Sequence, residues 1–420
     1  MTTIFTNIKL LVNTREKSEL LYGRELQNLP SVENAYLVVE DDEIADFGPM
    51  SKIPGSRLGS NSIESSGKMI LPCWCDSHTH LVFAESREQE FLDKIKGLSY
   101  AEIAAKGGGI INSASKLQEI SEDELFNRAW KRLEELSKLG TGAVEIKSGY
   151  GLTTESELTM LRVIKKLRER SNLYIKSTFL GAHTYPPGYQ EDHEGYINLI
   201  IHEMLPAIAA ENLADYIDVF CENGFFSAEE TDTICRAGMS YGLKPKLHVN
   251  QLNSIGGVET GIQLNALSLD HLETLTEDEI SLLGNASKSG TWKGVCTLLP
   301  SAAFFLRMPF QPARKLIDSG CAVALASDFN PGSSPSGNMN LVVAMSCIQM
   351  RMLPGEAINA ATLNGACAME LQNNLGTIGI GKKANLIMTK SIPSLAYLPY
   401  AFGSNLIEKV MIRGNWLELR

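Results

Sequence analysis

Two of the chain's seven histidines stand one residue apart at the end of an apolar run. They are His78 and His80, in the segment LPCWCDSHTHLVF at residues 71–83. Residues i and i+2 of a strand point to the same side, so the two imidazoles would converge if this run is a strand. Because imidazole nitrogen is a common zinc ligand, the segment indicates a metal site.

Three more histidines and one aspartate also end apolar runs. FLGAH ends at His183, KLHV contains His248, LSLDH ends at His271 and ALASD ends at Asp328. A catalytic zinc ion takes about three nitrogen or oxygen ligands from the protein and keeps a position for water. Any one of these histidines alone would more simply be a hydrogen-bonded polar residue of a packed core. Together they predict one metal site, whose ligands are His78, His80, His248 and Asp328.

A metal ion at these residues would make hydrolysis possible. It lowers the pKa of a bound water towards about 7, so that hydroxide is available near neutral pH. Asp328 could bind the ion and also accept a proton from that water. The remaining histidines, His193 and His202, fall in or near a helix pattern and are expected at the surface.

The elements that would position these residues alternate between apolar β runs and helix patterns, as in βα units. Eight such runs predict a (β/α)8 TIM-like barrel over residues 69–375, with its chemistry at the carboxyl ends of the strands. The predicted strands are 69–77, 142–147, 174–182, 215–221, 244–249, 266–271, 293–299 and 321–327. Capping boxes predict helix starts at Ser121 with Glu124, Thr154 with Glu157, Ser227 with Glu230, and Thr276 with Glu279.

Short β patterns occupy both ends of the chain. TNIKLLVN and AYLVVEDDEIADFG lie near the start, with EDDE as a hairpin tip, and KKANLIMTK and KVMIRGNWLELR lie near the end. We expect residues 1–68 and 376–420 to combine into one small β-sandwich domain beside the barrel.

Composition excludes several classes of protein. The 420 residues carry a formal net charge of −11, which argues against nucleic acid or an anionic membrane as a general partner. Eight cysteines without a CxxC pair are typical of reduced thiols. The start lacks the features of a secretory signal, and no apolar run reaches the roughly 18 residues of a membrane span. We therefore expect a cytoplasmic protein.

Several motifs carry a family resemblance that covers almost the whole chain. DSHTH, KLHVNQ, SLDHLE and SDFNPG resemble the amidohydrolase superfamily of metal-dependent hydrolases. FAESREQEF, GGGI, EIKSGYGL, FLGAHTYPPGY and SDFNPGSSP are similar to the imidazolonepropionase family within it. That resemblance implies one zinc or iron ion per chain, a cytoplasmic homodimer, and hydrolysis of 4-imidazolone-5-propanoate to N-formimidoyl-L-glutamate in histidine degradation.

The implied reaction gives further residues their expected roles. His271 is the expected proton carrier, and His183 is expected to donate to the ring carbonyl or the developing oxyanion. Arg87, in the first loop after the paired histidines, is expected to bind the propanoate carboxylate. The other expected substrate contacts are Tyr150, Gln251, Asn330, Gly332 and Ser333.

Two positions depart from common patterns of the superfamily. Relatives often carry glutamate where this chain has Gln251, and an amide cannot act as a general base, so Asp328 or His271 must take that role. Members with two metals usually carry a bridging carboxylated lysine at the end of strand four, where this chain reads VFCENG. Lys147 lies near the end of strand two instead, so a single ion is expected.

Alternative functions belong to two classes. Another mononuclear amidohydrolase, such as a nucleobase-type deaminase, would share the metal site and differ in the carboxylate anchor. An inactive barrel that serves as a binding or scaffold protein would not need the intact ligand set. The glycines at 107–109 lack the context of a dinucleotide fingerprint, and residues 97–110 are instead expected to form a loop that could cover the substrate.

Overall fold

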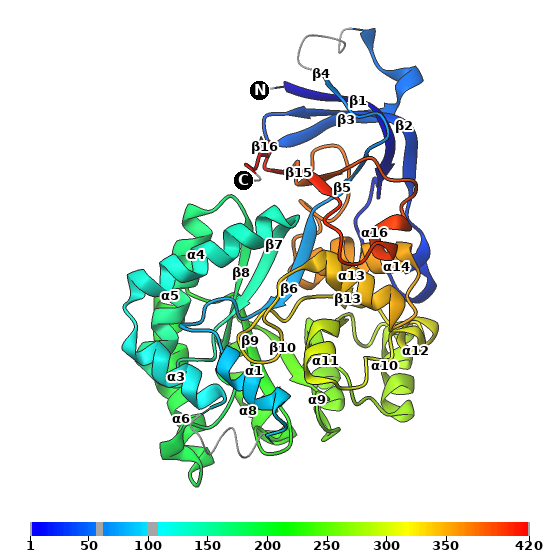
Figure 1. Ribbon diagram of the computed structural model, residues 1–420. Coiled ribbons are helices and arrows are strands. Elements are labelled where there is room, and N and C mark those ends of the chain that lie inside the picture. Colours follow the sequence, from blue (N-terminus) through cyan, green and yellow to red (C-terminus); the bar gives the residue numbers. More distant parts are fainter. Residues whose placement is uncertain (1, 56–61, 99–107, 419–420) are drawn as a thin grey trace.

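A barrel and a smaller sheet make up the computed structural model, which describes residues 2–55, 62–98 and 108–418 (Figure 1). Eight parallel strands follow one another in the order β6 to β13, with the helices on the outside. The second, mixed sheet is built from both chain ends, and both termini lie beside it. The predicted (β/α)8 barrel with a composite β domain is therefore confirmed.

Neighbouring barrel strands pair in parallel. Two backbone hydrogen bonds join the end of β6 to the segment that follows β13, from His80 N to Phe329 O (2.9 Å) and from Asp328 N to His78 O (3.0 Å). Closure therefore brings the predicted site residues His78 and His80 beside Asp328. The strands are β6 (Trp74–Thr79), β7 (Thr141–Lys147), β8 (Tyr174–Ala182), β9 (Tyr216–Cys221), β10 (Lys244–Val249), β11 (Ser268–His271), β12 (Val295–Leu298) and β13 (Val323–Leu325).

The predicted strand 69–77 is two strands that belong to different sheets. Met69–Pro72 (β5) pairs with β1 and β14 in the small sheet, whereas the barrel strand β6 begins at Trp74. Both strands are buried along their whole length, and the apolar run continues from β5 through Cys73 into the start of β6, so hydropathy could not separate them. The small sheet therefore extends past the predicted boundary at residue 68.

The small sheet has the order β16-β15-β14-β5-β1-β2-β3, with β4 paired to β1. Its antiparallel β2–β3 hairpin turns at Asp41 and Asp42, within the predicted EDDE tip. Its strands are β1 (Thr2–Val12), β2 (Ser31–Glu40), β3 (Glu43–Pro49), β4 (Ser62–Glu64), β5 (Met69–Pro72), β14 (Leu386–Thr389), β15 (Ile407–Ile412) and β16 (Asn415–Trp416).

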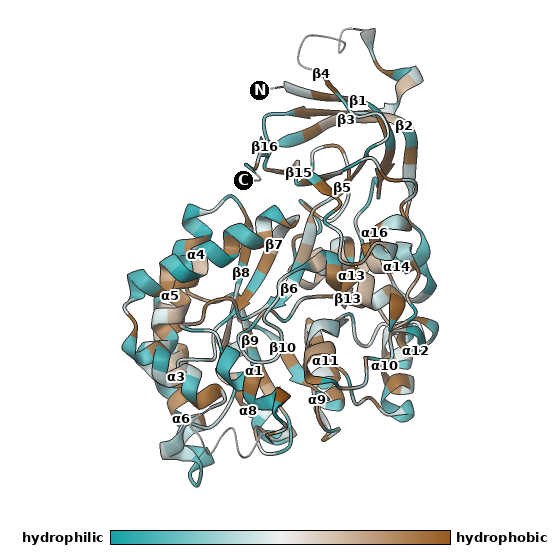
Figure 2. Ribbon diagram, viewed as in Figure 1, coloured by the Kyte–Doolittle hydropathy of each residue, from teal (hydrophilic) through white to brown (hydrophobic). Residues whose placement is uncertain are grey.

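Helices cover the barrel and turn their apolar residues inwards, so that outer helices such as α4 look largely hydrophilic in Figure 2. Short 3-10 turns cover Gly23–Gln27, Met50–Lys52 and Pro187–Tyr189, and π turns cover Ile200–Met204 and Ala360–Asn364. The α-helices are α1 (Glu88–Ile95), α3 (Ile110–Glu119), α4 (Glu122–Lys138), α5 (Thr154–Arg170), α6 (His193–Leu199), α7 (Leu205–Glu211), α8 (Ala228–Ser240), α9 (Gly257–Gln263), α10 (Glu277–Ser289), α11 (Pro300–Leu306), α12 (Ala313–Asp318), α13 (Met339–Ile348), α14 (Pro354–Asn359), α15 (Gly365–Ala368) and α16 (Tyr397–Tyr400).

Three of the four predicted helix starts are confirmed, with a complete capping box at Ser227 and Thr276 and only the serine half of it at Ser121, and the predicted cap of α5 is wrong by one residue. Ser121, Ser227 and Thr276 each accept a hydrogen bond from the backbone N–H three residues later. Helix α5 is capped by Thr153, because Thr154 already lies inside the helix. The carboxylate of Glu157 instead accepts the N–H groups of the preceding loop, those of Gly149, Gly151 and Leu152.

Most of the predicted covering loop lies outside the described residues, which resume at Gly108 after residue 98. No helix in the described part of the chain is long and apolar enough to cross a membrane.

Candidate active site

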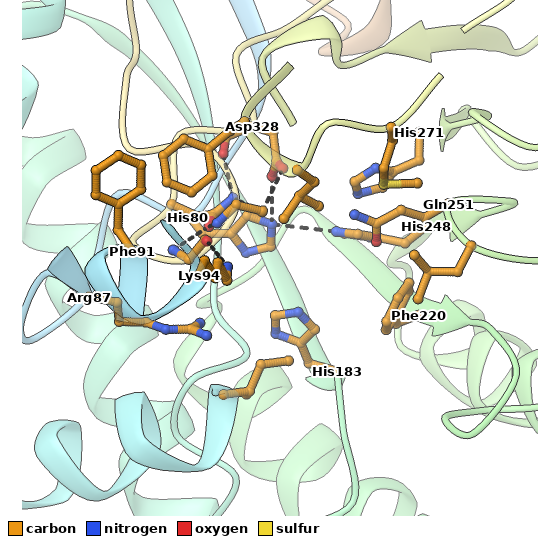
Figure 3. Close-up of a pocket in the computed structure, with 18 of the residues that line it drawn as sticks. His80, Arg87, Phe91, Lys94, His183, Phe220, His248, Gln251, His271 and Asp328 are labelled. Carbon is orange, nitrogen blue, oxygen red and sulfur yellow. Dashed lines mark hydrogen bonds and ion pairs between the residues drawn. The ribbon is translucent and has the colours of Figure 1, made fainter. Parts of the chain in front are cut away.

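A cavity of about 660 Å³ lies at the carboxyl ends of the barrel strands (Figure 3). Figure 3 shows His80 near its centre, with Asp328, His248 and His183 around it and Arg87 pointing in from the side. Every predicted catalytic or substrate-contacting residue lines the cavity: Arg87, Tyr150, His183, Gln251, His271, Asp328, Asn330, Gly332 and Ser333.

The four predicted metal ligands converge from β6, β10 and the end of β13, and all four are buried. The Nε2 atom of His80 lies 3.3 Å from that of His78 and 3.4 Å from that of His248. Asp328 Oδ1 lies 3.6 Å from the Nε2 atoms of both His78 and His80. Strand alternation and barrel closure bring these side chains close together, in two overlapping groups that could hold a metal ion. One is His78, His80 and Asp328, and the other is His78, His248 and His271.

Two observations show that these residues fit a metal ion. Zinc–nitrogen bonds of about 2.0–2.1 Å in a tetrahedral site separate the ligand atoms by about 3.4 Å, close to the spacings found here. The outer nitrogen of His78 is hydrogen-bonded to the carboxylate of Asp270, so its proton lies there and its Nε2 lone pair turns towards the other rings. The outer nitrogen of His248 lies 3.0 Å from the carboxylate of Asp218. Neutral imidazoles with facing lone pairs repel one another unless a cation lies between them. The His/Asp cluster could therefore bind a metal ion.

Carboxylates inside the barrel hold two of the three histidines. Asp270 Oδ2 lies 2.7 Å from His78 Nδ1, and Asp218 Oδ2 lies 3.0 Å from His248 Nδ1. Asp218 also accepts the backbone N–H of His248 through Oδ1 (3.1 Å). Such partners fix the ring orientation of metal-binding histidines. Burial lowers the pKa of His78 and His248 well below the ordinary value, which keeps both rings in the neutral form that binds metal.

His271 has the opposite protonation preference. Burial lowers its pKa, but the carboxylate of Glu273, 3.3 Å from Nδ1, together with Asp328 and Asp270, outweighs burial, and the pKa is raised to about 9. Gln311 holds Glu273 in place by donating a hydrogen bond of 2.9 Å. His271 also has a left-handed backbone (φ 84°), a conformation that non-glycine residues adopt mainly where the surrounding structure enforces it.

Arg87 lines the cavity and is also ion-paired with Glu90. Its Nε and Nη2 atoms donate to Glu90 Oε2 at 2.9 and 2.7 Å. The free edge of the guanidinium approaches Gly332 so closely that a Cβ on this glycine would lie 2.3 Å from Nη1. Lys94 lies on the same side and donates to the carbonyl of Gly332 (3.3 Å). The three charged side chains leave one net positive charge beside Gly332.

The loop after β13 uses the polar groups of Asn330 internally. Its amide oxygen accepts the N–H groups of Gly332 and Ser333, both at 2.8 Å, and its amide nitrogen donates to Asp328 O and Ser333 Oγ. Asn330 therefore shapes the loop that presents Asp328 and has no amide group left for a ligand. This differs from the expectation that Asn330 contacts substrate directly.

His183 can accept a hydrogen bond from a ligand but is not set up to donate one. Its Nδ1 lies 3.0 Å from the carbonyl of Gly149, so Nδ1 carries the proton and Nε2 carries a lone pair. Burial lowers its pKa to about 4, so the ring is neutral near pH 7. The expectation that His183 donates to an oxyanion does not fit this tautomer.

The other expected contacts keep their polar groups available. Tyr150 is buried beside His80 and His183, with ring centroids 5.9 and 5.5 Å away. Gln251 lines the cavity, and its side chain has no hydrogen bond to another described residue. His193 and His202 lie away from the site, on α6 and the π turn after it, as predicted.

Sequence reasoning did not identify the residues that hold the site residues in place. They are Glu90, Lys94, Asp218, Asp270, Glu273 and Gln311. Glu90 has a usable signal, because a charge three residues after Arg87 on a helix can pair with it. Asp218 and Asp270 also have one, since a charged residue within an otherwise apolar barrel strand requires a buried partner.

A family model and several named relatives place this chain among the amidohydrolases. Residues 226–417 match a model described as the Amidohydrolase family. A protein named imidazolonepropionase from Flavobacterium johnsoniae is 56% identical over 419 residues, 99% of this chain and 100% of that protein. One of the same name from Thermoanaerobacter pseudethanolicus is 41% identical, over 93% of this chain and 91% of that protein.

Solved structures resemble the fold at low identity. A triazine hydrolase variant has a TM-score of 0.73 and 14% identity, over 99% of this chain and 94% of that one. Guanine deaminase from C. acetobutylicum with bound guanine has a TM-score of 0.69 and 18% identity, over the full length of both chains. These likenesses concern the fold alone.

The pairing of Glu273 with His271 predicts the protonation state of the metal-free protein. We expect His271 to be protonated at pH 7, and Glu273→Gln to make it neutral there, because burial then acts without the largest opposing charge. A folded pKa above 6.5 contributes stability that is fully present below pH 6.5 and is lost as the pH rises through about 9.

Imidazole ¹⁵N chemical shifts, recorded against pH on metal-free protein, measure this directly. The native protein should titrate His271 well above its ordinary range and Glu273→Gln should not. The same midpoint in both proteins would rule out Glu273 as the cause.

Proposed function

This chain belongs to the imidazolonepropionase family of the amidohydrolases, and from that premise we propose which of its residues perform each part of the reaction. It is a hydrolase that opens the ring C–N bond of 4-imidazolone-5-propanoate and gives N-formimidoyl-L-glutamate, a step of histidine degradation. The observation that carries the assignment of residues is the convergence of three histidine Nε2 atoms and Asp328 inside the cavity.

We propose that His78, His80, His248 and Asp328 hold one zinc or iron ion per chain. When bound, the ion would supply a water of lowered pKa and polarise the ring carbonyl. The ligand spacings, the neutral histidines and their supporting carboxylates favour this assignment. The absence of a lysine at the end of β9, which reads VFCENG, favours one ion over two.

Asp328 and His271 divide the proton transfers. In the metal-free protein burial raises the pKa of Asp328 to about 7. Its carboxylate lies beside the ligand nitrogens, where it can take the proton that the attacking water loses. His271, which Glu273 holds in its protonated form, is the group placed to give a proton to the ring nitrogen as the C–N bond breaks. This division needs no carboxylate at Gln251.

The propanoate tail is bound at the positive edge of the cavity. Arg87 offers the guanidinium edge that Glu90 leaves free, and Lys94 adds positive charge beside it. A guanidinium gives two parallel hydrogen bonds to a carboxylate, which the single ammonium of lysine cannot copy. The glycine at 332 leaves the space that this guanidinium occupies.

The remaining contacts select the ring. The Nε2 lone pair of His183 is suited to accept an N–H of the imidazolone ring, and the Tyr150 hydroxyl and Gln251 amide can donate to its polar atoms. Ser333 offers its hydroxyl beside Asp328 at 3.4 Å. Asn330 acts through the loop that it closes.

The alternatives are less well supported. A nucleobase-type deaminase would not require the cations beside Gly332, and the solved deaminase that matches is similar only in fold. A homodimer and a cytoplasmic location belong to this proposal, the first from the family resemblance and the second because all eight cysteines are free.

Replacing His248 by alanine should remove metal and activity together. Elemental analysis of the native protein should give about one zinc or iron per chain, as a mononuclear site requires. The matched control is His202→Ala, which removes an exposed histidine on the π turn and should keep both. Full activity of a metal-free, chelator-treated sample would contradict the metal proposal.

Replacing His271 by alanine should lower kcat by roughly 10²–10⁴, the range for loss of a general acid or base. Metal content should stay near that of the native protein, because the four proposed ligands remain. Steady-state kinetics across pH measure both kcat and its pH profile. A normal kcat with an unchanged profile would show that the proton comes from elsewhere.

Replacing Arg87 by methionine should lower kcat/KM by roughly 10²–10³, at about 1.4 kcal/mol per tenfold. Arg87→Lys should recover only part of this loss, and metal content should not change. Slow turnover of a ring substrate without the propanoate serves as the control and should be nearly indifferent to the change. An equal loss of kcat/KM for both substrates would contradict the role of Arg87 in binding the propanoate.

A further inference from the structure

Five ionisable side chains lie fully buried in the barrel beneath the three histidines. They are Glu145 and Lys147 of β7, Asp218 of β9, Lys246 of β10 and Asp270 of β11. Residues i and i+2 of a strand share a face, which places Glu145 and Lys147 together inside the barrel. Three carboxylates and two ammonium groups must compensate one another there, because solvent does not reach them.

Lys147 contacts both of the carboxylates that hold metal-site histidines. Its Nζ lies 2.8 Å from Asp218 Oδ2 and 3.5 Å from Asp270 Oδ2. The same Asp218 oxygen faces His248 Nδ1 at 3.0 Å, and the same Asp270 oxygen faces His78 Nδ1 at 2.7 Å. One ammonium group therefore stands behind two of the three imidazoles, with one carboxylate between it and each ring.

The charge of Lys147 keeps this arrangement intact. Leaving a buried charge without its partner is strongly destabilising, so without this ammonium group Asp218 and Asp270 would have to reorient towards other partners. Their oxygens would then leave the ring nitrogens that they face, and both rings would lose a support for their orientation. Burial also lowers the pKa of Lys147, but Asp218, Glu145 and Asp270 outweigh it and raise that pKa above the ordinary value, so the ammonium stays charged.

Lys246 provides a natural comparison within the same cluster. It is equally buried and pairs with the other oxygen of Glu145. It also donates to the backbone carbonyls of Ser77 and Ala368, both at 3.3 Å, and its Nζ lies 5.3 Å from the centroid of the Tyr216 ring. It makes no ion pair with Asp218 or Asp270, so the two lysines differ in their access to the histidine supports and not in burial.

We propose that Lys147 is a positioning residue that orients His78 and His248 together, so that the affinity of the cluster for its metal ion depends on this one ammonium group. The proposal rests on the proposed function, because it takes these two histidines to be metal ligands. It gives a role to the lysine that lies on the wrong strand to bridge two metals.

Two double variants with equal charge test it. E145Q/K147M and E145Q/K246M each lose one carboxylate and one ammonium group, so they differ only in which lysine remains. For both, Zn²⁺ affinity is measured by competition with a chromophoric chelator. The absorption spectrum of the Co²⁺-loaded protein reports ligand geometry, and thermal unfolding of the metal-free protein reports stability.

We expect E145Q/K147M to bind Zn²⁺ about 10–100-fold more weakly than the native protein, the range found when an outer partner of a ligand is lost. Its Co²⁺ spectrum should change. E145Q/K246M should lose far less than tenfold and keep the native spectrum, even if both variants are destabilised alike. Equal Zn²⁺ affinities in the two double variants would overturn the proposal.

A further variant covers the case in which E145Q/K147M does not fold. K147Q keeps a hydrogen-bond donor but not the charge, and it should also weaken Zn²⁺ binding, whereas native affinity in K147Q would overturn the proposal. Failure of the proposed function and failure of the Lys147 proposal give different results. A native protein that binds no Zn²⁺ or iron would remove the proposed function, while native binding with equal double variants removes only the role of Lys147.

Discussion

The structure depends on holding three neutral imidazoles with their lone pairs aimed at one buried point. Such an arrangement is unfavourable without a cation, so the protein must enforce it before a metal arrives. Strand alternation fixes His78 and His80, parallel pairing across the barrel brings His248 opposite, and closure of β6 on the segment after β13 adds Asp328. The buried carboxylate of Asp270 then fixes the ring of His78 by a hydrogen bond, and Asp218 lies against His248.

The same barrel gives neighbouring groups different protonation states. The ligand histidines are neutral, whereas His271 beside them is protonated, because Glu273 faces its outer nitrogen across a short, strained turn. Asp328 differs from both kinds of histidine, because its pKa lies near neutral pH. A site that hydrolyses a cyclic amide needs both a proton acceptor and a proton donor, and burial with selective pairing supplies both within one cavity.

The barrel, the composite sheet and the convergence of the site residues could be predicted from sequence, because the spacing of His78 and His80 and the alternation of β runs are local signals. Contacts that depend on packing could not. Nothing in hydropathy divides residues 69–77 between two sheets at Cys73. The tautomer of His183 depends on the carbonyl of Gly149, and the use of Asn330 within its own loop depends on the turn that follows.

The most direct test of the central claim is anomalous X-ray diffraction from crystals of the native protein, collected at the zinc and iron absorption edges. The account predicts one anomalous peak per chain, between the Nε2 atoms of His78, His80 and His248 and the carboxylate of Asp328. A peak bound elsewhere, a second strong peak beside His271, or none from active, metal-replete protein would contradict it.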